Sequence, residues 1–546
     1  MSNKKLSNSL ANFKMEVNPH FLAKAEQLQP QLYHTEVPAT TAIDYALSAT
    51  QGDYVATAQR PFSASEPLSQ GSKLVLDFKD HCVGQLHFKV RSVGSPADAP
   101  LHLRIKLGER LCELGIDSAS YTGKISSSWI QEEFLHVDVM PATITLPRRY
   151  AWRYVEFTVL DTSPKYQVVI EEVAATTVSS APTNASSSLT TEQLNQASQV
   201  SGLSTEAISA LDRVAIKTLA ECMQSVFEDG PKRDRRLWIG DLRLEALANY
   251  YTFKQNDLVA RCLYLFAGAA QNEQRVGANL FIQPQVQVDD TYLFDYALFF
   301  VSCLHDYFVA TGDEATLKEL YATAKKQIDI CARRLDDSGL VADSDDWWCF
   351  IDWQDDLNKQ ASAQAIFIYA LRQTLVLSTH LGLAEDKQYY EKLLARCITA
   401  AQTKLFATEL GFFVSGADKQ ISYASQAWMV LAHVMPVEQN RQLLKRLEQE
   451  RRAGNSSIVS MVTPYMYHHY VEALFVTGLT HEAWSLVQEY WGAMIADGAD
   501  CFYELFDPRN KQFSPYGSPI INSYCHAWSC TPTYFIRKYA LSCNAQ

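Results

Sequence analysis

The sequence has no run of 18 uninterrupted apolar residues and no CxxC pair among its twelve cysteines. The first absence argues against a membrane-spanning helix, which needs about 20 largely apolar residues. The N-terminal segment has no apolar stretch behind Lys4 and Lys5, so we expect no secretory signal peptide. Cysteines scattered singly in such a chain are expected to be reduced and buried, not joined in disulfides or bound to zinc. Together these absences predict a cytoplasmic protein.

Positive charge is also in deficit. The chain has 48 lysines and arginines against 61 aspartates and glutamates, a net charge of −13. Such a balance argues against nonspecific binding to nucleic acid or to anionic membranes. GxSxG, P-loop and GxGxxG motifs are missing as well, which leaves little support for a serine hydrolase or a nucleotide-binding enzyme.

What is present is the composition of a folded protein. The chain has 546 residues, 47% of them hydrophobic and 20% charged, which is enough for two or three domains. Aromatic residues make up 11%, and eight of the ten tryptophans lie after residue 230. This concentration is typical either of a large aromatic core or of a binding cavity, and composition alone favours the core.

The first third of the sequence alternates with period two. Between residues 70 and 175, short runs place apolar side chains on one face, as Leu86, Phe88 and Val90 show. Such runs separated by polar turns predict an antiparallel β-sandwich, which we assign with an N-terminal extension to residues 1–175. The pattern leaves open whether residues 1–70 belong to the sandwich or wrap the helical domain. The Ser/Thr/Asn/Ala-rich stretch 176–200 is predicted to be a linker.

After residue 200 the apolar period becomes 3.6. Ser204 is expected to open a helix that carries Ile208, Leu211 and Leu219 on one side. Later helices come in pairs separated by short turns near residues 256, 312, 382 and 478. This pattern predicts a toroid or a solenoid of antiparallel helix pairs over residues 201–546, and the spacing does not distinguish the two.

The most unusual segment is DGPKRDRRLWIGD, residues 229–241. Gly230 and Pro231 break helices, so the segment is predicted to be a loop at the end of an element. Taken alone, its mixed charges are more typical of a solvated salt-bridge cluster. Trp238 does not fit a solvated loop, and Asp241 is expected to cap the helix that follows.

This segment resembles the catalytic loop of α-L-rhamnosidases of glycoside hydrolase family 78. The family's usual general-acid glutamate falls on Asp234, one methylene shorter, and some members resemble this chain in having R-D-R there. The segment GADCFYE, residues 498–504, resembles the family's G-A-T-T-x-x-E, whose glutamate is the general base. The resemblance therefore implies that Asp234 is the catalytic acid and Glu504 the catalytic base.

Other segments extend the resemblance to about residues 70–535. NSYCHAW, residues 522–528, resembles a sugar-contacting motif, and the tryptophan-rich acidic stretch around Trp347 resembles an aromatic wall of the sugar pocket. The resemblance implies an N-terminal antiparallel β-sandwich followed by an (α/α)6 helical toroid, in a short form without the C-terminal β-domain of larger relatives. The substrate-binding residues that it implies are Asp229, Arg233, Trp238, Asp241, Trp347, Asp352, Trp353 and His526.

The expected function is an inverting exo-α-L-rhamnosidase acting on small glycosides. Hydrolysis of a glycosidic bond needs a protonated carboxyl group at the leaving oxygen and an ionised one that holds water, so no cofactor and no metal are expected. The adjacent pair His468 and His469 is a poor metal site, because neighbouring helix residues point about 100° apart. A homodimer is a family-level expectation.

Two other functions stay open from the sequence. One is a related (α/α)6 glycosidase or a lyase for another sugar. The other is a carbohydrate-binding scaffold without catalysis, in which Asp234 is a decayed acid. Turnover of a rhamnoside distinguishes both from the leading hypothesis.

Overall fold

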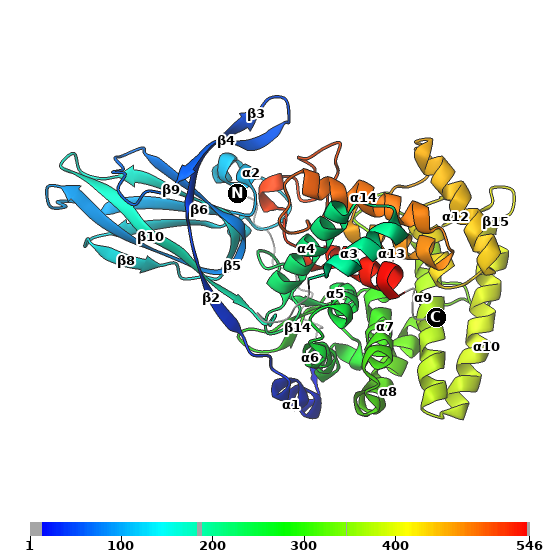
Figure 1. Cartoon of the computed structure of the whole chain (residues 1–546). Coiled ribbons are helices and arrows are strands. Elements are labelled where there is room, and N and C mark those ends of the chain that lie inside the picture. Colours follow the sequence, from blue (N-terminus) through cyan, green and yellow to red (C-terminus); the bar gives the residue numbers. More distant parts are fainter. Residues whose placement is uncertain (1–13, 183–187, 345–346, 543–546) are drawn as a thin grey trace.

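The computed structural model describes residues 14–182, 188–344 and 347–542. An antiparallel sheet domain lies beside a larger helical domain (Figure 1). The first 13 residues lie outside the described residues, and the expectation that no signal peptide is present there stays a prediction. No helix in the described ranges is long and apolar enough to cross a membrane.

The sheet domain contains nine hydrogen-bonded strands in the described part of the chain. Its longest strand, β5, shifts register between Asp77 and Cys82, pairs with β9 on both sides of that shift and then with β10. All strands therefore belong to one bent hydrogen-bonded network. The strands are β2 (Tyr33–Pro38), β3 (Thr41–Ser48), β4 (Asp53–Pro61), β5 (Lys73–Gly94), β6 (Leu101–Gly108), β7 (Glu132–Val137), β8 (Ala142–Thr145), β9 (Tyr150–Asp161) and β10 (Tyr166–Ser179).

The period-two alternation of the sequence is confirmed in these strands. Leu86, Phe88 and Val90 are fully buried in the core of the sheet domain, with Phe157 of β9 packed edge-on against Phe88 at 5.0 Å. Side chains on one face of a strand repeat every second residue, so burial of that face supplies the hydrophobic free energy that holds the sheet.

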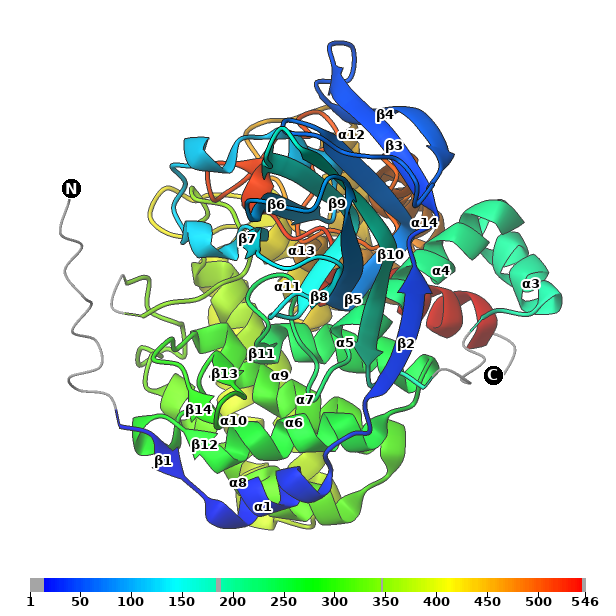
Figure 2. The ribbon, with the colours of Figure 1, turned by 90° about the vertical axis from the view of Figure 1, so that its left-hand side faces the viewer.

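The N-terminal segment belongs partly to the helical domain. Strand β1 (Glu16–Val17) pairs with β12 (Ala269–Ala270), and helix α1 (Pro19–Gln27) packs against α6 (Asn256–Gly268). From there β2 runs upward to the edge of the sheet, where it pairs with β10 (Figure 2). The segment ahead of the sheet therefore links both domains.

The helical domain closes on itself. An inner set of helices makes contact in chain order, α5 with α7, α7 with α9, α9 with α11 and α11 with α13. Stacking of His468 on Phe535 joins α13 to α15, and α15 contacts α5. These inner helices are α5 (Ile239–Tyr251), α7 (Phe294–Thr311), α9 (Gln360–His380), α11 (Tyr423–Leu431), α13 (Pro464–Val476) and α15 (Pro532–Phe535). The outer helices are α4 (Thr205–Cys222), α6, α8 (Glu314–Ala332), α10 (Ala384–Ala400), α12 (Val437–Arg452) and α14 (Thr480–Ala496).

The sequence explains which helices lie inside the ring. Every residue of α11 is buried, as expected for a largely apolar helix without charged residues, and its Gln426 side chain donates to the carbonyl of Phe413. The outer helix α12 buries one stripe that contains Leu443, Leu444 and Leu447 and is otherwise charged. Ser204 caps α4 through the amide of Ala207, and Gly312 ends α7 in the left-handed conformation, both where the sequence predicts them.

Two local expectations differ from the structure. Strand β10 runs to Ser179 and helix α3 (Thr191–Ser201) begins soon after, so both ends of the stretch 176–200 are regular structure. The prediction that Asp241 caps a helix is wrong, because α5 already begins at Ile239 and Asp241 lies in its first turn. Pairing of Leu237 and Trp238 with β13 (Asn279–Phe281) holds the chain extended up to that point.

A buried lysine joins the two domains. Lys232 is 2% exposed, and its Nζ lies 2.8 Å from Glu113 Oε2 and 3.2 Å from Glu109 Oε2. It also donates a hydrogen bond to the carbonyl of Asn522. Both glutamates belong to the sheet domain, so one cation from the loop before α5 bridges two buried carboxyl groups across the junction.

We predict that Lys232→Met lowers the free energy of unfolding by about 3–5 kcal/mol, because it leaves buried carboxylates without their partner. Urea unfolding followed by tryptophan fluorescence measures the change. The matched control is Lys79→Met, since the Lys79 side chain is 44% exposed beside Asp77 and its loss should change little. Equal stabilities of the two variants would contradict the prediction.

Candidate active site

The loop between α4 and α5 is organised by Asp229. Its Oδ1 accepts a hydrogen bond from the amide of Arg236 at 3.0 Å, and its Oδ2 accepts one from the amide of Asp234 at 3.3 Å. Burial and the neighbouring Asp234 carboxylate raise the pKa of Asp229 well above its usual value. The carboxylate thus shapes the loop that presents Asp234.

Two later loops are joined to this one by backbone hydrogen bonds. The amide of Ala527 donates to the carbonyl of Asp229 at 2.7 Å, and the amide of Glu504 donates to the carbonyl of Ser523 at 3.0 Å. The indole of Trp528 donates to the carbonyl of Glu504 at 2.9 Å. The three segments that the sequence singles out at 229–241, 498–504 and 522–528 are therefore in direct contact.

One guanidinium contacts both predicted catalytic carboxyl groups. Arg233 Nη2 donates to Glu504 Oε2 at 2.5 Å, and Arg233 Nη1 lies 3.8 Å from Asp234 Oδ1. The Asp234 side chain is 25% exposed, whereas those of Asp229 and Asp241 are 7% and 3% exposed. Of these three carboxyl groups, Asp234 is the one that an incoming ligand reaches most readily.

Glu504 is buried but held as a carboxylate. Its Oε1 accepts from the hydroxyl of Tyr516 at 2.5 Å, and its Oε2 accepts from Arg233 and from the amide of Ser523 at 3.4 Å. Burial by itself raises the pKa of Glu504, but Arg233, His526 and the Tyr516 hydrogen bond lower it by more, so the net pKa lies below its usual value. An ionised Glu504 is what a general base requires.

These groups line one cavity of about 270 Å³ at the N-terminal ends of α5 and α7. Seven of the eight predicted substrate-binding residues and both predicted catalytic residues lie on its wall. The predicted residues that line it are Asp229, Arg233, Asp234, Trp238, Asp241, Asp352, Trp353, Glu504 and His526.

Two residues of the cavity wall each have a buried polar atom without a hydrogen-bond partner in the described part of the protein. Asp241 Oδ1 and His526 Nδ1 are buried 3.7 Å apart, and neither has a hydrogen-bond partner among the described residues. Burial and Asp229 raise the pKa of Asp241 well above its usual value, and burial lowers the pKa of His526 to about 4. Buried polar atoms are rarely left unsatisfied, so a ligand hydroxyl is a natural partner for both.

The aromatic wall differs in one residue from the expectation. Trp347 packs on Phe294 with ring centroids 4.9 Å apart, and its indole donates to the carbonyl of Ala342 at 3.2 Å, so it is not on the cavity wall. Its neighbour Trp348, 63% exposed, lines the cavity instead. The ring of Phe350, stacked on Trp528 at 5.7 Å, continues the wall.

Asp352 lines the cavity, but its carboxylate is engaged with the protein. It accepts hydrogen bonds from the amides of Trp353, Val462 and Thr463 and from the Thr463 hydroxyl at 2.6 Å. Thr463 is the N-cap of α13, so Asp352 fastens the aromatic loop to that helix. Burial raises the pKa of Asp352 to about 6 against these hydrogen bonds. Its contacts are those of a positioning residue.

Tyr516 is a site residue that sequence reasoning missed. It lies in a loop of the C-terminal region, donates to Glu504, and packs its ring 4.3 Å from the Arg233 guanidinium. The surrounding sequence, SPYGSP, carries turn residues and no catalytic motif, so nothing in it indicates this contact.

We predict that Arg233→Met moves the acidic limb of the kcat/KM pH profile upward by about 1–3 pH units, the effect of one close opposite charge. Glu504 must be ionised, so activity is lost as pH falls through its pKa. Because Arg233 lowers that pKa, its removal makes the loss begin at higher pH. Arg236→Met is the matched control, since Arg236 packs on Phe281 and pairs with Asp289. An acidic limb that stays in place would contradict this role of Arg233.

A closed ring of helical hairpins that opens onto paired carboxyl groups and aromatic rings is the architecture of the six-hairpin glycoside hydrolases, and this chain is one of them. The sequence model of the bacterial α-L-rhamnosidase six-hairpin glycosidase domain matches residues 196–540, and that of the glycosyl hydrolase family 78 α-rhamnosidase N-terminal domain matches residues 49–177. The chain therefore belongs to glycosyl hydrolase family 78.

Solved structures agree with this assignment. A rhamnosidase from Klebsiella oxytoca with rhamnose bound is 45% identical, with a TM-score of 0.90 over 96% of this chain and 100% of that one. The family 78 rhamnosidase of Bacillus sp. GL1 is 20% identical, with a TM-score of 0.69 over 89% of this chain and 50% of that one, and it shares the fold. No curated protein matches the chain.

Proposed function

We propose that the chain is an exo-acting α-L-rhamnosidase that removes terminal α-L-rhamnosyl residues from small glycosides with inversion of configuration. Flavonoid or terpenyl rhamnoglucosides and short oligosaccharides are the proposed substrates. The observation that carries the proposal is the contact of one arginine, Arg233, with both Asp234 and Glu504 on the wall of a single cavity. Family membership supports the choice of rhamnose.

Asp234 is proposed as the general acid. Its carboxyl group is the more exposed of the pair, as a group must be that protonates the glycosidic oxygen of a bound substrate. As the bond to the anomeric carbon breaks, the proton of Asp234 moves to the leaving oxygen and prevents an alkoxide from forming. Arg233 at 3.8 Å then stabilises the carboxylate that remains.

Glu504 is proposed as the general base. Three hydrogen bonds fix its carboxylate and keep it ionised, so it can take a proton from a water molecule that attacks the anomeric carbon from the opposite face. The proton ends on Glu504 and the hydroxyl on the sugar. A single displacement of this kind inverts the configuration.

The spacing of the two groups is compatible with this mechanism. The contacts of Arg233 together with the width of its guanidinium keep the nearest carboxyl oxygens no more than about 9 Å apart. Inverting glycosidases need about 6.5–9.5 Å and retaining ones about 5–5.5 Å. The upper limit of about 9 Å is compatible with inverting and with retaining hydrolysis. Identification of the first-formed anomer therefore decides between them.

The cavity itself supports recognition of one neutral sugar. Its volume of about 270 Å³ lies just below the range for drug-sized ligand sites, about 300–1,000 Å³, as expected for a site that holds a single sugar ring. Asp241 and His526 offer partners for hydroxyl groups, and the rings of Trp238, Phe350 and Trp353 offer faces for the apolar side of a 6-deoxysugar. Trp347 is not included in this proposal because it packs away from the cavity.

We also propose that the enzyme acts in the cytoplasm as a homodimer. Singly spaced, buried thiols in the described residues support a reducing compartment. The dimer rests on the family alone. Light scattering coupled to size exclusion chromatography measures the oligomeric state directly.

The experiment that tests the activity is a panel of p-nitrophenyl glycosides followed by NMR of the product. Release of p-nitrophenol from the α-L-rhamnoside, with β-rhamnose as the first-formed anomer, is the expected result. α-Rhamnose as the first product would overturn inversion. Cleavage of another glycoside in preference would identify a related glycosidase, and sugar binding without turnover would identify a scaffold.

A further inference from the structure

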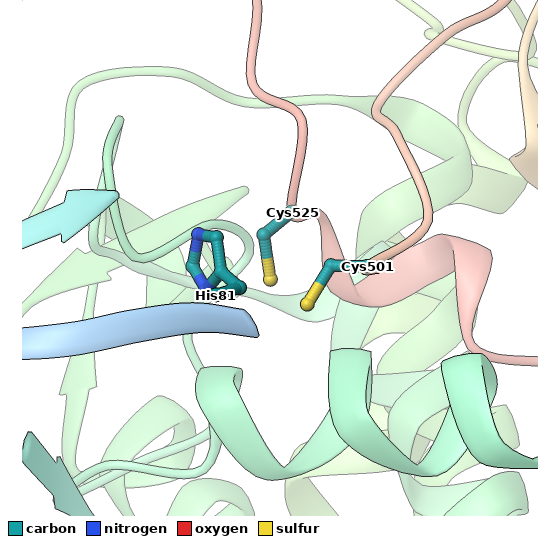
Figure 3. A group of neighbouring side chains, drawn as sticks. All are labelled: His81, Cys501 and Cys525. Carbon is teal, nitrogen blue, oxygen red and sulfur yellow. The ribbon is translucent and has the colours of Figure 1, made fainter. Parts of the chain in front are cut away.

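A buried group of metal-binding side chains lies where the two domains meet. His81, at the register shift of β5, and Cys501 and Cys525, from the two loops that carry Glu504 and His526, converge on one point (Figure 3). One ligand atom of each, a ring nitrogen and two sulfurs, lies within 4.8 Å of the others. All three are essentially inaccessible to solvent, with exposures of 1%, 0% and 0%.

The ring of His81 is held in the orientation that a metal ligand needs. Its Nε2 lies 3.0 Å from Glu109 Oε1, so a proton on Nε2 is donated to that buried carboxylate. In the neutral ring with its proton on Nε2, the Nδ1 lone pair is available to an ion, and Nδ1 has no hydrogen-bond partner among the described residues. A histidine that donates one nitrogen to a carboxylate and offers the other to an ion is the usual arrangement at protein metal centres.

Further donor atoms border the group. Glu221 Oε2 lies 3.7 Å from His81 Nδ1, and the thiol of Cys222 belongs to the same buried cluster as those of Cys501 and Cys525. Zinc in structural sites takes four ligands from cysteine, histidine and carboxylate at about 2.0–2.3 Å. A small contraction of the three side chains around an ion, with one of these two neighbours as the fourth ligand, completes such a set.

We propose that His81, Cys501 and Cys525 form a structural Zn²⁺ site that ties strand β5 to the two loops bearing Glu504 and His526. On binding, the two thiols release two protons to solvent and become thiolates, and their two negative charges neutralise the ion, while His81 binds as the neutral imidazole. The proposal departs from the expectation that the cysteines are inert core residues and that the protein holds no metal.

The position of the site gives it a defined consequence. Cys501 precedes Glu504 by three residues, and Cys525 is adjacent to His526. An ion that fixes both cysteines to the sheet domain therefore stabilises the segments on which the base and a cavity residue lie. We expect the metal to act on stability, since its ligands do not line the active-site cavity.

Metal analysis of the full-length protein tests the proposal. The chain is produced with Zn²⁺ in the medium, passed over a desalting column with a weak chelator, and measured by plasma mass spectrometry. We expect about one zinc per wild-type chain and less than a tenth of that for Cys501→Ser and Cys525→Ser. The matched control is Cys397→Ser, which removes an equally buried thiol of α10 and should keep about one zinc.

Two further measurements start from the wild-type protein. Adding Zn²⁺ to wild-type protein stripped by a strong chelator should raise the melting temperature by about 5 °C or more. Replacing Zn²⁺ with Co²⁺ should produce the intense visible absorption of a tetrahedral thiolate site. Glu221→Gln and Cys222→Ser, compared in the same cobalt spectrum, identify the fourth ligand.

The proposal fails on any of three results. Wild-type protein that takes up less than a tenth of an equivalent of Zn²⁺ contains no such site. If Cys397→Ser loses as much zinc as Cys501→Ser, the metal does not bind specifically at the proposed site. A disulfide between Cys501 and Cys525, detected by mass spectrometry of the unreduced protein, means that the two sulfurs serve a covalent link instead.

Discussion

Glu504→Gln is expected to lower kcat by about 10²–10⁴-fold on any rhamnoside, the usual contribution of a general base. Glutamine keeps the shape of the side chain and can still accept from Tyr516 or Arg233, but its amide cannot take a proton from water. Because the glutamine oxygen can keep one of these hydrogen bonds and the other cavity residues are unchanged, rhamnose should still bind. Steady-state kinetics and calorimetric titration with rhamnose measure the two effects separately.

A matched control is Glu228, the glutamate that directly precedes the loop carrying Asp229 and Asp234. Glu228 is buried and pairs with Arg149 at 2.6 Å, away from the cavity, so Glu228→Gln should leave kcat within about twofold of wild type. If Glu504→Gln keeps more than a tenth of the wild-type kcat while folded, Glu504 is not the base. A fall in rhamnose affinity that matches the fall in kcat/KM would instead make it a binding residue.

The two domain types could be predicted from the sequence because apolar residues repeat with period two in the sheet domain and with period 3.6 in the helical domain. Leu86, Phe88 and Val90 alternate and are fully buried, and Ser204 caps the helix that the 3.6 period predicts. These are local signals, in which a few consecutive residues determine both the pattern and the structure. The closure of the helices into a ring is a long-range property, and only the family resemblance implied it.

The sequence did not predict which tryptophan of the aromatic wall lines the cavity. Trp347 and Trp348 are adjacent, and in an irregular loop nothing in the sequence says which of two neighbours faces inward. The answer depends on the contacts of Asp295, whose carboxylate accepts from the amides of Phe350 and Ile351 at 3.1 Å and sets the path of the loop. Asp295 lies more than fifty residues earlier, which no spacing rule connects.

The cluster of His81 with Cys501 and Cys525 could not be predicted either, because it also depends on contacts between residues far apart in the sequence. Metal motifs are recognised by short ligand spacings, and here the histidine and the cysteines are more than 400 residues apart. Singly spaced cysteines therefore have the pattern of ordinary core residues. Only the docking of the sheet domain on the helical ring brings the three side chains together.

Asp234→Asn is the second variant with a large expected effect, and its effect should depend on the leaving group. An asparagine cannot protonate the glycosidic oxygen, so kcat/KM should fall by about 10²–10⁴-fold on a rhamnoside whose leaving group is an alcohol or a sugar. p-Nitrophenol leaves readily as an anion, so on that substrate the fall should be about tenfold or less. Glu504→Gln, in contrast, removes the base and should lower both rates alike.

The ratio of the two rates therefore identifies the acid without requiring that every variant bind equally well. Asp229→Asn and Asp241→Asn are the informative controls, since both carboxyl groups line the same cavity and differ from Asp234 in being buried. Each should weaken activity on the two substrates by a similar factor, because each acts on the loop or on binding. If Asp229→Asn or Asp241→Asn shows the leaving-group dependence instead, that residue is the general acid. If Asp234→Asn lowers kcat/KM equally on both substrates, Asp234 is not the general acid.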